Sequence, residues 1–318
     1  MTKHEEVSEG FDDPLDLGKV SSEVMRRSVF PFLPMEEAPD LDGGVLRLTG
    51  NMVVAHSPSI GVPLEALGFF AFHYAASNVA VRFGSPKHLV TGIYLPLKTR
   101  EKDLRTIARG LGEEAERYGV TVVAGQTATY SGLEIPLLTA TCIGEPVRGA
   151  VMPRPGDKVL MAGEVGGEAV WLDAVSRGSG GEEWREFTPL EAALSLQEVE
   201  GVRLMHDVSE GGVKKALLEI VEARGVGLEV DSSKIQFARG AERLGQDLLR
   251  APTYGSLLVV VDPGAVGDAE RACAKAEVPL CEIGVVTGDA SVLVDGEKVG
   301  VLERIALDEI YGAFKKEN

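Results

Sequence analysis

A cluster of prolines and a glycine near the middle of the sequence divides the 318 residues into two halves. Such residues interrupt helices and strands and are typical of linkers. The cluster comprises Pro146, Pro153, Pro155 and Gly156. Each half is long enough to bury a hydrophobic core, because domains commonly span about 100–200 residues. We therefore expect an N-terminal segment over residues 1–40, a domain over residues 41–150 and a second domain over residues 151–318.

The first half alternates between helical and extended patterns of apolar residues. The predicted helices are Ser21–Val29, Leu64–Val81 and a helix that Thr99 caps and Gly119 ends. The predicted strands are Val45–Leu48, Met52–His56, Val90–Leu95, Val120–Ala124 and Ile135–Ile143. Helices and strands joined by short connections predict a compact α+β domain.

The second half also mixes helices and strands. The predicted strands are Val159–Ala162, Val226–Val230, Leu257–Val261, Ile283–Val286 and Ser291–Val294. The predicted helices are Glu168–Ser176, Pro189–Val199 and an amphipathic helix that runs from Val213 to Gly225. Its apolar residues recur at i, i+3, i+4, i+7 and i+8, which is the spacing of one helix face. We expect a mixed sheet with helices packed on it.

Charge and composition exclude several classes of protein. The chain has 49 acidic and 32 basic residues, a formal net charge of −17, whereas non-specific nucleic-acid binding needs a surplus of Lys and Arg. No apolar run approaches the roughly 20 residues of a membrane span, and no apolar run follows a basic N-terminus as in a signal peptide. We therefore expect a cytoplasmic protein without nucleic-acid or membrane partners. The three cysteines show no CxxC spacing, which disfavours a disulfide framework or a zinc site.

Residues 205–213, with the sequence MHDVSEGGV, are the strongest candidate for a binding site. Gly211 and Gly212 lead directly into the predicted amphipathic helix. A helix start offers unpaired N–H groups and a positive dipole end, and glycines let a phosphate approach the backbone. The alternative is an ordinary helix start, with Ser209 as the N-cap and Glu210 in the first turn.

Two stretches of the first half end in polar residues. In the first, a buried strand ends at Gly125 and is followed by Gln126 and Thr127, where α/β proteins place ligand contacts. In the second, Ser77 and Asn78 lie late in a helix of small residues. The alternatives are an ordinary exit from a strand and an Asn buried for packing or helix termination, and on the residues alone we favour them.

These three stretches in this order, with the segments RPGDKVLMAG and APTYGSLLVVV, resemble the aminoimidazole-ribonucleotide (AIR) synthase-like, or PurM-like, superfamily. The opening Leu17-Gly18-Lys19-Val20 is similar to that of archaeal HypE-related proteins. The resemblance covers roughly residues 15–310. It implies an N-terminal α/β domain that forms a barrel shared in a homodimer, and a C-terminal mixed-sheet α/β domain. It also implies ATP in a cleft between the two halves and Mg²⁺ held by acidic side chains.

The sequence departs from the family at the positions that the resemblance assigns to the metal. Neutral Ser57, Asn78 and Gln126 stand where members commonly have acids. The acidic segment near the start is reduced to residues 40–44, with Asp42. An amide or hydroxyl adds no negative charge, so we expect Mg²⁺ to bind weakly or not at all. The chain also has no cysteine after Cys281, whereas the hydrogenase-maturation branch carries one at its end.

The sequence thus predicts a homodimer that binds ATP or another small phosphorylated ligand. If it is an enzyme, the resemblance implies ATP-dependent phosphoryl activation of an amide-type oxygen. The alternative is a non-catalytic binding or scaffold protein that has lost the Mg²⁺-binding acids. The resemblance assigns the ligand contacts to Gly18, Lys19, Asp42, Ser57, Asn78, Gln126, Thr127, Asp207, Glu210, Gly211 and Gly212.

Overall fold

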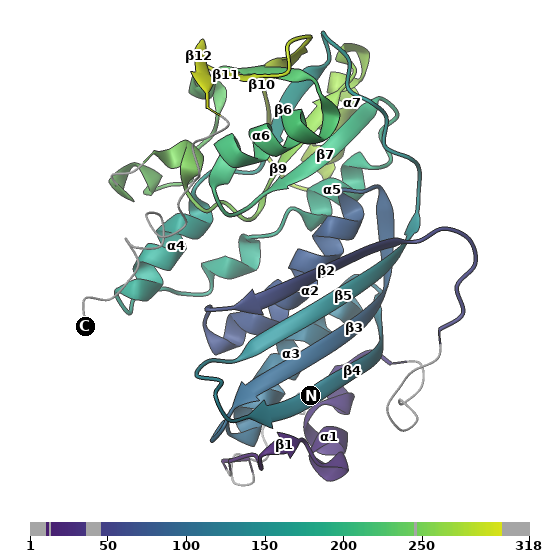
Figure 1. Cartoon of the computed structure of the whole chain (residues 1–318), viewed down its shortest axis with the longest axis vertical. Coiled ribbons are helices and arrows are strands. Elements are labelled where there is room, and N and C mark those ends of the chain that lie inside the picture. The colour runs from purple at the N-terminus through teal and green to yellow at the C-terminus, as the bar shows by residue number, and fades with distance from the viewer. Residues whose placement is uncertain (1–10, 13, 36–45, 245–246, 301–318) are drawn as a thin grey trace. The chain divides into compact units, whose positions relative to one another are not determined.

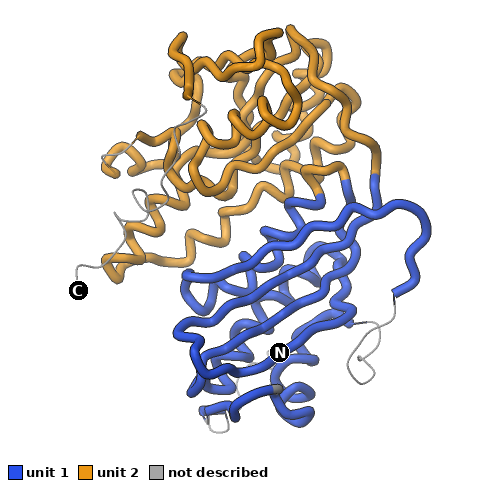
Figure 2. Tube along the Cα trace, viewed as in Figure 1, with its two compact units in different colours: residues 1–79, 84–146 blue, residues 80–83, 147–318 orange. Residues whose placement is uncertain are grey.

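The computed structural model describes residues 11–12, 14–35, 46–244 and 247–300, which fold into two compact units (Figures 1 and 2). Unit 1 comprises the residues up to 79 together with 84–146, and unit 2 comprises 80–83 together with the residues from 147 onward. The main boundary between the units therefore lies at Pro146, the first proline of the central cluster.

Unit 1 is a five-stranded sheet with helices on one face (Figure 1). The strand order is β1 (Gly18–Lys19), β4 (Thr121–Tyr130), β3 (Gly84–Pro96), β5 (Leu137–Pro146) and β2 (Val53–Ile60). β3 and β4 are parallel, and the other neighbours are antiparallel. The helices are α1 (Ser22–Ser28), α2 (Leu64–Ala80) and α3 (Glu101–Arg117), with a 3₁₀ turn at Phe30–Phe32.

The predicted helix of small residues, α2, is confirmed and is almost entirely buried. Its alanines and phenylalanines are inaccessible to solvent, which explains why the sequence shows no polar face. A Cβ atom on Gly68 would lie 2.4 Å from the backbone nitrogen of Leu111 in α3. Only a glycine therefore permits this approach between the two helices.

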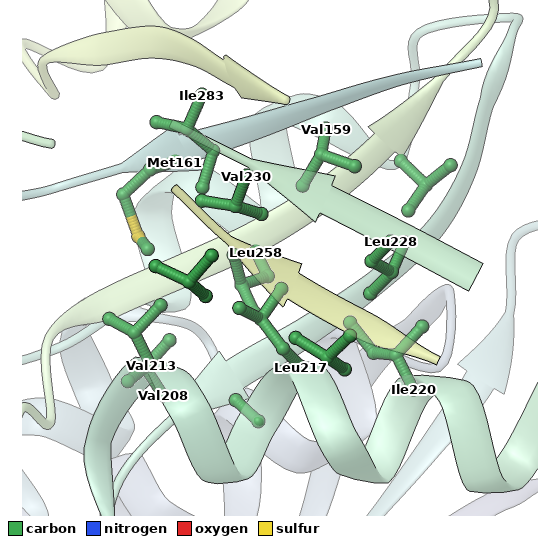
Figure 3. Packing of buried hydrophobic residues seen from close by; sticks show 14 of the residues in the cluster. Val159, Met161, Val208, Val213, Leu217, Ile220, Leu228, Val230, Leu258 and Ile283 are labelled. Carbon is green, nitrogen blue, oxygen red and sulfur yellow. The ribbon is translucent and has the colours of Figure 1, made fainter. Parts of the chain in front are cut away.

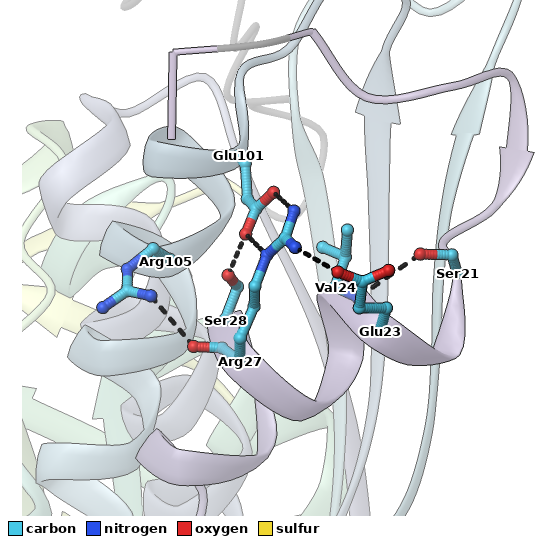
Figure 4. A network of polar contacts seen from close by, with 7 residues as sticks. All are labelled: Ser21, Glu23, Val24, Arg27, Ser28, Glu101 and Arg105. Atoms are coloured by element: carbon cyan, nitrogen blue, oxygen red, sulfur yellow. Dashed lines mark hydrogen bonds and ion pairs between the residues drawn. The ribbon is translucent and has the colours of Figure 1, made fainter. Parts of the chain in front are cut away.

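The predicted N-terminal helix is confirmed as α1, which Ser21 caps by accepting a hydrogen bond from the Val24 N–H. Two nitrogens of Arg27 each donate to a Glu101 oxygen of α3 at 2.7 Å (Figure 4). Ser28 donates a further short hydrogen bond to Glu101. The hydrogen bond from Arg27 lowers the pKa of Glu101 despite its burial. These bonds fasten α1 to the start of α3.

Unit 2 is a seven-stranded mixed sheet covered by helices. The strand order is β12 (Glu297–Val299), β11 (Val292–Val294), β8 (Gly227–Val230), β10 (Leu280–Thr287), β6 (Lys158–Ala162), β9 (Ser256–Val261) and β7 (Val202–Val208). The helices are α4 (Gly167–Ser176), α5 (Leu190–Leu196), α6 (Gly212–Arg224) and α7 (Val266–Lys275). Short 3₁₀ turns occur at Glu183–Glu186, Ser232–Lys234, Ala241–Leu244, Leu248–Arg250 and Pro263–Ala265. Among the described strands of this sheet, only β8 and β11 are parallel neighbours.

The predicted amphipathic helix is confirmed as α6. Its apolar face packs on the sheet and places Val213, Leu217 and Ile220 in the core of the unit (Figure 3). Gly225 ends the helix as predicted, with a φ of 66° and an N–H that bonds to the Val221 carbonyl at 2.8 Å.

Several elements differ from those expected. Residues 46–52 form no strand, so the strand predicted over Val45–Leu48 is wrong for the described residues. Strand β4 continues to Tyr130 instead of ending at Gly125. The sequence did not predict β7, because the polar His206 and Asp207 interrupt its apolar run. It also missed β1, β12 and α7. Thr99 is not the N-cap of α3; Arg100 is.

Candidate functional site

Three loops of unit 2 meet at one end of its sheet, and together they are called the loop cluster: residues 163–168, 209–212 and 251–255. The antiparallel register explains the meeting, because Ala162 at the end of β6 pairs with Leu257, and Val208 at the end of β7 pairs with Ser256. The ends of β6 and β7 therefore lie beside the start of β9.

Thr253 connects the three loops. Its Oγ1 accepts a hydrogen bond from the Gly166 N–H at 3.1 Å, and its own N–H donates to the Ser209 carbonyl at 3.4 Å. The Ser256 hydroxyl donates to the Glu164 carbonyl at 2.7 Å. These bonds bring the starts of α4 and α6 together within one unit.

Both helices start at a glycine in the left-handed region, Gly166 with a φ of 87° and Gly211 with a φ of 83°. Neither start has a hydrogen bond from a capping side chain. The alternative in which Ser209 is the N-cap of α6 is therefore wrong: Gly211 is the N-cap, and Ser209 contributes its carbonyl, which accepts the Gly212 N–H at 3.1 Å. Two helix starts without side-chain caps add positive dipole ends to the cluster.

Gly212 has a different role from Gly211. A Cβ atom on Gly212 would lie 2.6 Å from the Leu249 carbonyl oxygen and 2.7 Å from that of Ala251, and its φ is 63°. The chain's own backbone at Leu249 and Ala251 thus lies close to this glycine. Gly212 is required for this packing, and its contact with a phosphate stays a prediction.

Asp207 and His206, at the end of β7, belong to a small charged group. His206 Nε2 lies 2.8 Å from Glu219 Oε2 of α6, and His206 Nδ1 lies 3.8 Å from Asp207 Oδ1. Burial raises the pKa of Asp207, and the attraction of His206 lowers it only in part. Burial lowers the pKa of His206, but the Glu219 hydrogen bond and the Asp207 charge outweigh it, so that pKa is raised. Glu210 is exposed.

Glu168 is a buried carboxyl in the loop cluster that sequence reasoning did not single out. It lies in the first turn of α4, and its Oε2 accepts the Tyr254 N–H at 2.7 Å. Burial raises the pKa of Glu168 to about 7, the Tyr254 N–H opposes the rise, and the charge of Glu210 adds to it. An acid in a first turn is so common that the sequence carries no signal for its burial.

In unit 1, the structure brings Ser57 and Asn78 together. The Asn78 amide, in the last turn of α2, donates a hydrogen bond of 3.2 Å to the Ser57 hydroxyl of β2. Ser57 is buried, and the pair carries no charge. These two predicted site residues therefore form one neutral contact between the sheet and α2.

Gln126 lies on the other face of the sheet from Ser57. Ser57 of β2 pairs with Ala140 of β5. Gln126 of β4 pairs with Gly92 of β3, and Gly92 pairs with Thr139 of β5, the residue next to Ala140. Because side chains of successive rows point to opposite faces, Gln126 does not join the contact between Ser57 and Asn78.

Thr127 lies next to the N-terminal segment. Its carbonyl accepts the Val20 N–H at 3.1 Å, and Gly18 and Lys19 pair with the next residues of β4. Gly18 has a φ of 98°, and its N–H bonds to the Thr129 hydroxyl at 3.0 Å.

The remaining predicted residue, Asp42, lies outside the described residues. Within the described ranges, no group of three or more His, Cys, Asp or Glu side chains is placed to hold a metal ion. The described part of the chain also contains no helix with the length and hydropathy of a membrane span.

Comparison with known proteins identifies the family. The model for the N-terminal domain of AIR synthase related proteins matches residues 41–145, and the model for their C-terminal domain matches residues 154–296. The hydrogenase expression/formation protein HupE of Azotobacter chroococcum is 27% identical over 276 residues, which cover 78% of this chain and 79% of HupE. The carbamoyl dehydratase HypE of Azotobacter vinelandii is 27% identical over 242 residues, 70% of this chain and 69% of HypE.

A solved structure shows the same fold. The hydrogenase maturation protein HypE, in complex with ATP, superposes with a TM-score of 0.71 at 20% identity, over 84% of this chain and 90% of that one. The resemblance noted in the sequence is therefore confirmed, and the chain belongs to the AIR synthase-related proteins, with both the N-terminal and the C-terminal domain of that family.

Proposed function

We propose that this protein binds ATP or another phosphorylated ligand and uses ATP in the phosphoryl activation of an amide-type oxygen. The observation that carries the proposal is the loop cluster, where Thr253 joins two helix starts that lack side-chain caps. Backbone N–H groups and helix dipoles at such starts favour a phosphate. The HypE structure in complex with ATP supports the choice of ligand.

Asp207, Glu210, Gly211 and Gly212 would flank the phosphates from unit 2. The contacts proposed from the N-terminal half are Gly18, Lys19, Asp42, Ser57, Asn78 and Thr127, whereas Gln126 lies on the other face of the sheet from Ser57. Gly212 would contact the ligand in addition to its packing against the carbonyl oxygens of Leu249 and Ala251.

Isothermal titration with ATP tests the proposal, and Ser209→Asp is the informative variant. A carboxylate there repels a phosphate, and we expect at least a tenfold loss of affinity. The same carboxylate stabilises a helix start, so a loss of binding would not reflect unfolding of α6. Ser179→Asp, at an exposed position beyond α4, is the matched control. Absence of ATP binding by the unmodified protein, or equal binding by the Ser209→Asp variant, would refute the proposed site.

A second function, a non-catalytic homodimeric binding or scaffold protein, is favoured by the neutral contact between Ser57 and Asn78. Mg²⁺ supports phosphoryl transfer by neutralising developing charge, and a neutral pair contributes nothing to holding the ion. Measurement of ATP hydrolysis with and without Mg²⁺ separates the two functions. Turnover that requires Mg²⁺ would rule out the scaffold.

We further propose that unit 1 forms the homodimer through the face of its sheet that α2 and α3 do not cover. Val54, Ile60 and Tyr130 are exposed to 60%, 50% and 44%, a large apolar exposure for one sheet. A stable interface needs about 1,200 Å² or more of buried surface. A monomeric mass in light scattering at micromolar concentration would contradict the dimer.

A further inference from the structure

Glu168 fastens one loop of the cluster to the start of α4. The residue is 8% exposed, and its Oε2 accepts the N–H of Tyr254 at 2.7 Å. The Ala169 N–H, next in the chain, donates to the Pro252 carbonyl at 3.2 Å. The carboxyl of Glu168 thus helps to set the position of residues 251–255 relative to the two helix starts.

The charges around Glu168 do not neutralise it. Among the described residues, no Lys, Arg or His makes an ion pair with Glu168. The charge of Glu210, in the loop before α6, is negative and raises the pKa of Glu168. The basic Lys214 of α6 is bound to Asp247 at 2.7 Å, and His206 is bound to Glu219. In the loop before α4, Glu164 is exposed and also acidic. An ionised Glu168 would therefore be a buried, unpaired negative charge.

We propose that Glu168 is a positioning residue that couples the binding of a phosphorylated anion in the loop cluster to the uptake of one proton. This inference rests on the proposed function. The anion adds negative charge beside Glu168 and Glu210, which favours the neutral form of the buried carboxyl. A proton passes from solvent to Glu168, and no covalent bond of the ligand changes.

The neutral carboxyl keeps its structural role. One of its oxygens still accepts the Tyr254 N–H, so residues 251–255 stay in place while the repulsion of the anion is removed. Because the pKa of Glu168 is about 7, both forms are populated at neutral pH in the absence of ligand. Binding then becomes weaker as the pH rises above about 7, by up to about tenfold per pH unit.

Calorimetric titration of the full chain with ATP, in two buffers of different ionisation enthalpy, measures the number of protons taken up. The variant Glu168→Gln is uncharged and keeps an oxygen that can accept the Tyr254 N–H, and it also corrects for protons taken up by ATP itself. Glu164→Gln, an exposed acid in the same loop, is the matched control.

We expect the unmodified protein and the Glu164→Gln variant to take up protons at about pH 8 and the Glu168→Gln variant to take up measurably fewer. Equal proton numbers in all three proteins, with ATP bound, would overturn the coupling and leave the proposed function standing. If the folded protein binds no ATP at either acidic or alkaline pH, the proposed function fails and the coupling fails with it. Carbon-13 NMR of the Glu168 carboxyl, with and without ATP, reports the same proton directly, and an unchanged titration would also overturn the coupling.

Discussion

Replacement of Glu168 by Gln should change how the stability of the protein depends on pH, whether or not a ligand binds. Burial raises the pKa of this carboxyl from an ordinary 4.5 to about 7. Each pKa unit corresponds to about 1.4 kcal/mol, so ionisation of Glu168 in the folded state costs about 3 kcal/mol. The side chain is nearly inaccessible to solvent, so water screens little of this cost.

The sign follows from where the proton is held. Between pH 4.5 and about 7, the folded protein keeps the proton of Glu168 and the unfolded chain has lost it. Stability is therefore full below pH 4.5 and is lost as the pH rises through 7. Gln cannot ionise, so the variant does not lose this stability.

Denaturant unfolding at a series of pH values measures the effect. The free energy of unfolding of Glu168→Gln, minus that of the unmodified protein, should increase by about 3 kcal/mol between acidic and alkaline pH. His206 and Asp207 are present in both proteins, so their titrations largely cancel in the difference. Glu164→Gln, an exposed acid of the same loop, is the matched control. Parallel stability curves for Glu168→Gln and the unmodified protein would show that the buried carboxyl does not titrate as argued.

Three further changes test other parts of the structure. Gly212→Val should lower the free energy of unfolding by about 2 kcal/mol or more in denaturant melts, because its Cβ would meet carbonyl oxygens at 2.6 and 2.7 Å; unchanged stability would contradict that packing. Glu101→Ala should lower the free energy of unfolding by about 1–3 kcal/mol, because Arg27 then loses the carboxylate that binds two of its nitrogens. Glu23→Ala, which removes an exposed ion pair of Arg27, should lower it by less than about 1 kcal/mol. Equal losses in the two variants would contradict this role of Glu101. Removal of Mg²⁺ should change the affinity for ATP only slightly, because neutral residues stand at the positions of the metal-binding acids. Ser57→Asp should make the affinity for ATP, measured by calorimetry, depend more strongly on Mg²⁺. A strong dependence on Mg²⁺ in the unmodified protein would refute this argument.

Periodicity predicted the long helices of both units correctly. The apolar spacing of α6 and the glycine that ends it are local signals, and tertiary packing did not override them. The same method missed β7, because His206 and Asp207 break the apolar run of this edge strand, where His206 contacts Glu219 of α6. A short strand such as β1 has too few residues to show a periodic pattern of apolar side chains. It forms because its backbone can pair with the edge of β4.

The candidate site was predictable only where one continuous segment forms it. Residues 205–213 were found from their own sequence, but the loops that pack against them, 163–168 and 251–255, come from distant positions. Glu168 was missed for this reason, since the N–H that its carboxyl accepts belongs to Tyr254, which is 86 residues away in the chain. The opposite faces of Ser57 and Gln126 likewise follow from strand register, which single residues do not reveal.

The paired glycines show why a motif can be specific for a fold and still say little about a ligand. Gly212 is required because the backbone at Leu249 and Ala251 packs against it, a constraint that holds with or without a bound phosphate. Gly211 is required because the start of α6 needs a left-handed backbone conformation there, which is again a requirement of the fold. Substitution of either glycine would thus weaken folding and binding together and could not separate them. A charge placed at Ser209 can separate them, because it favours the helix start and opposes the anion at the same position.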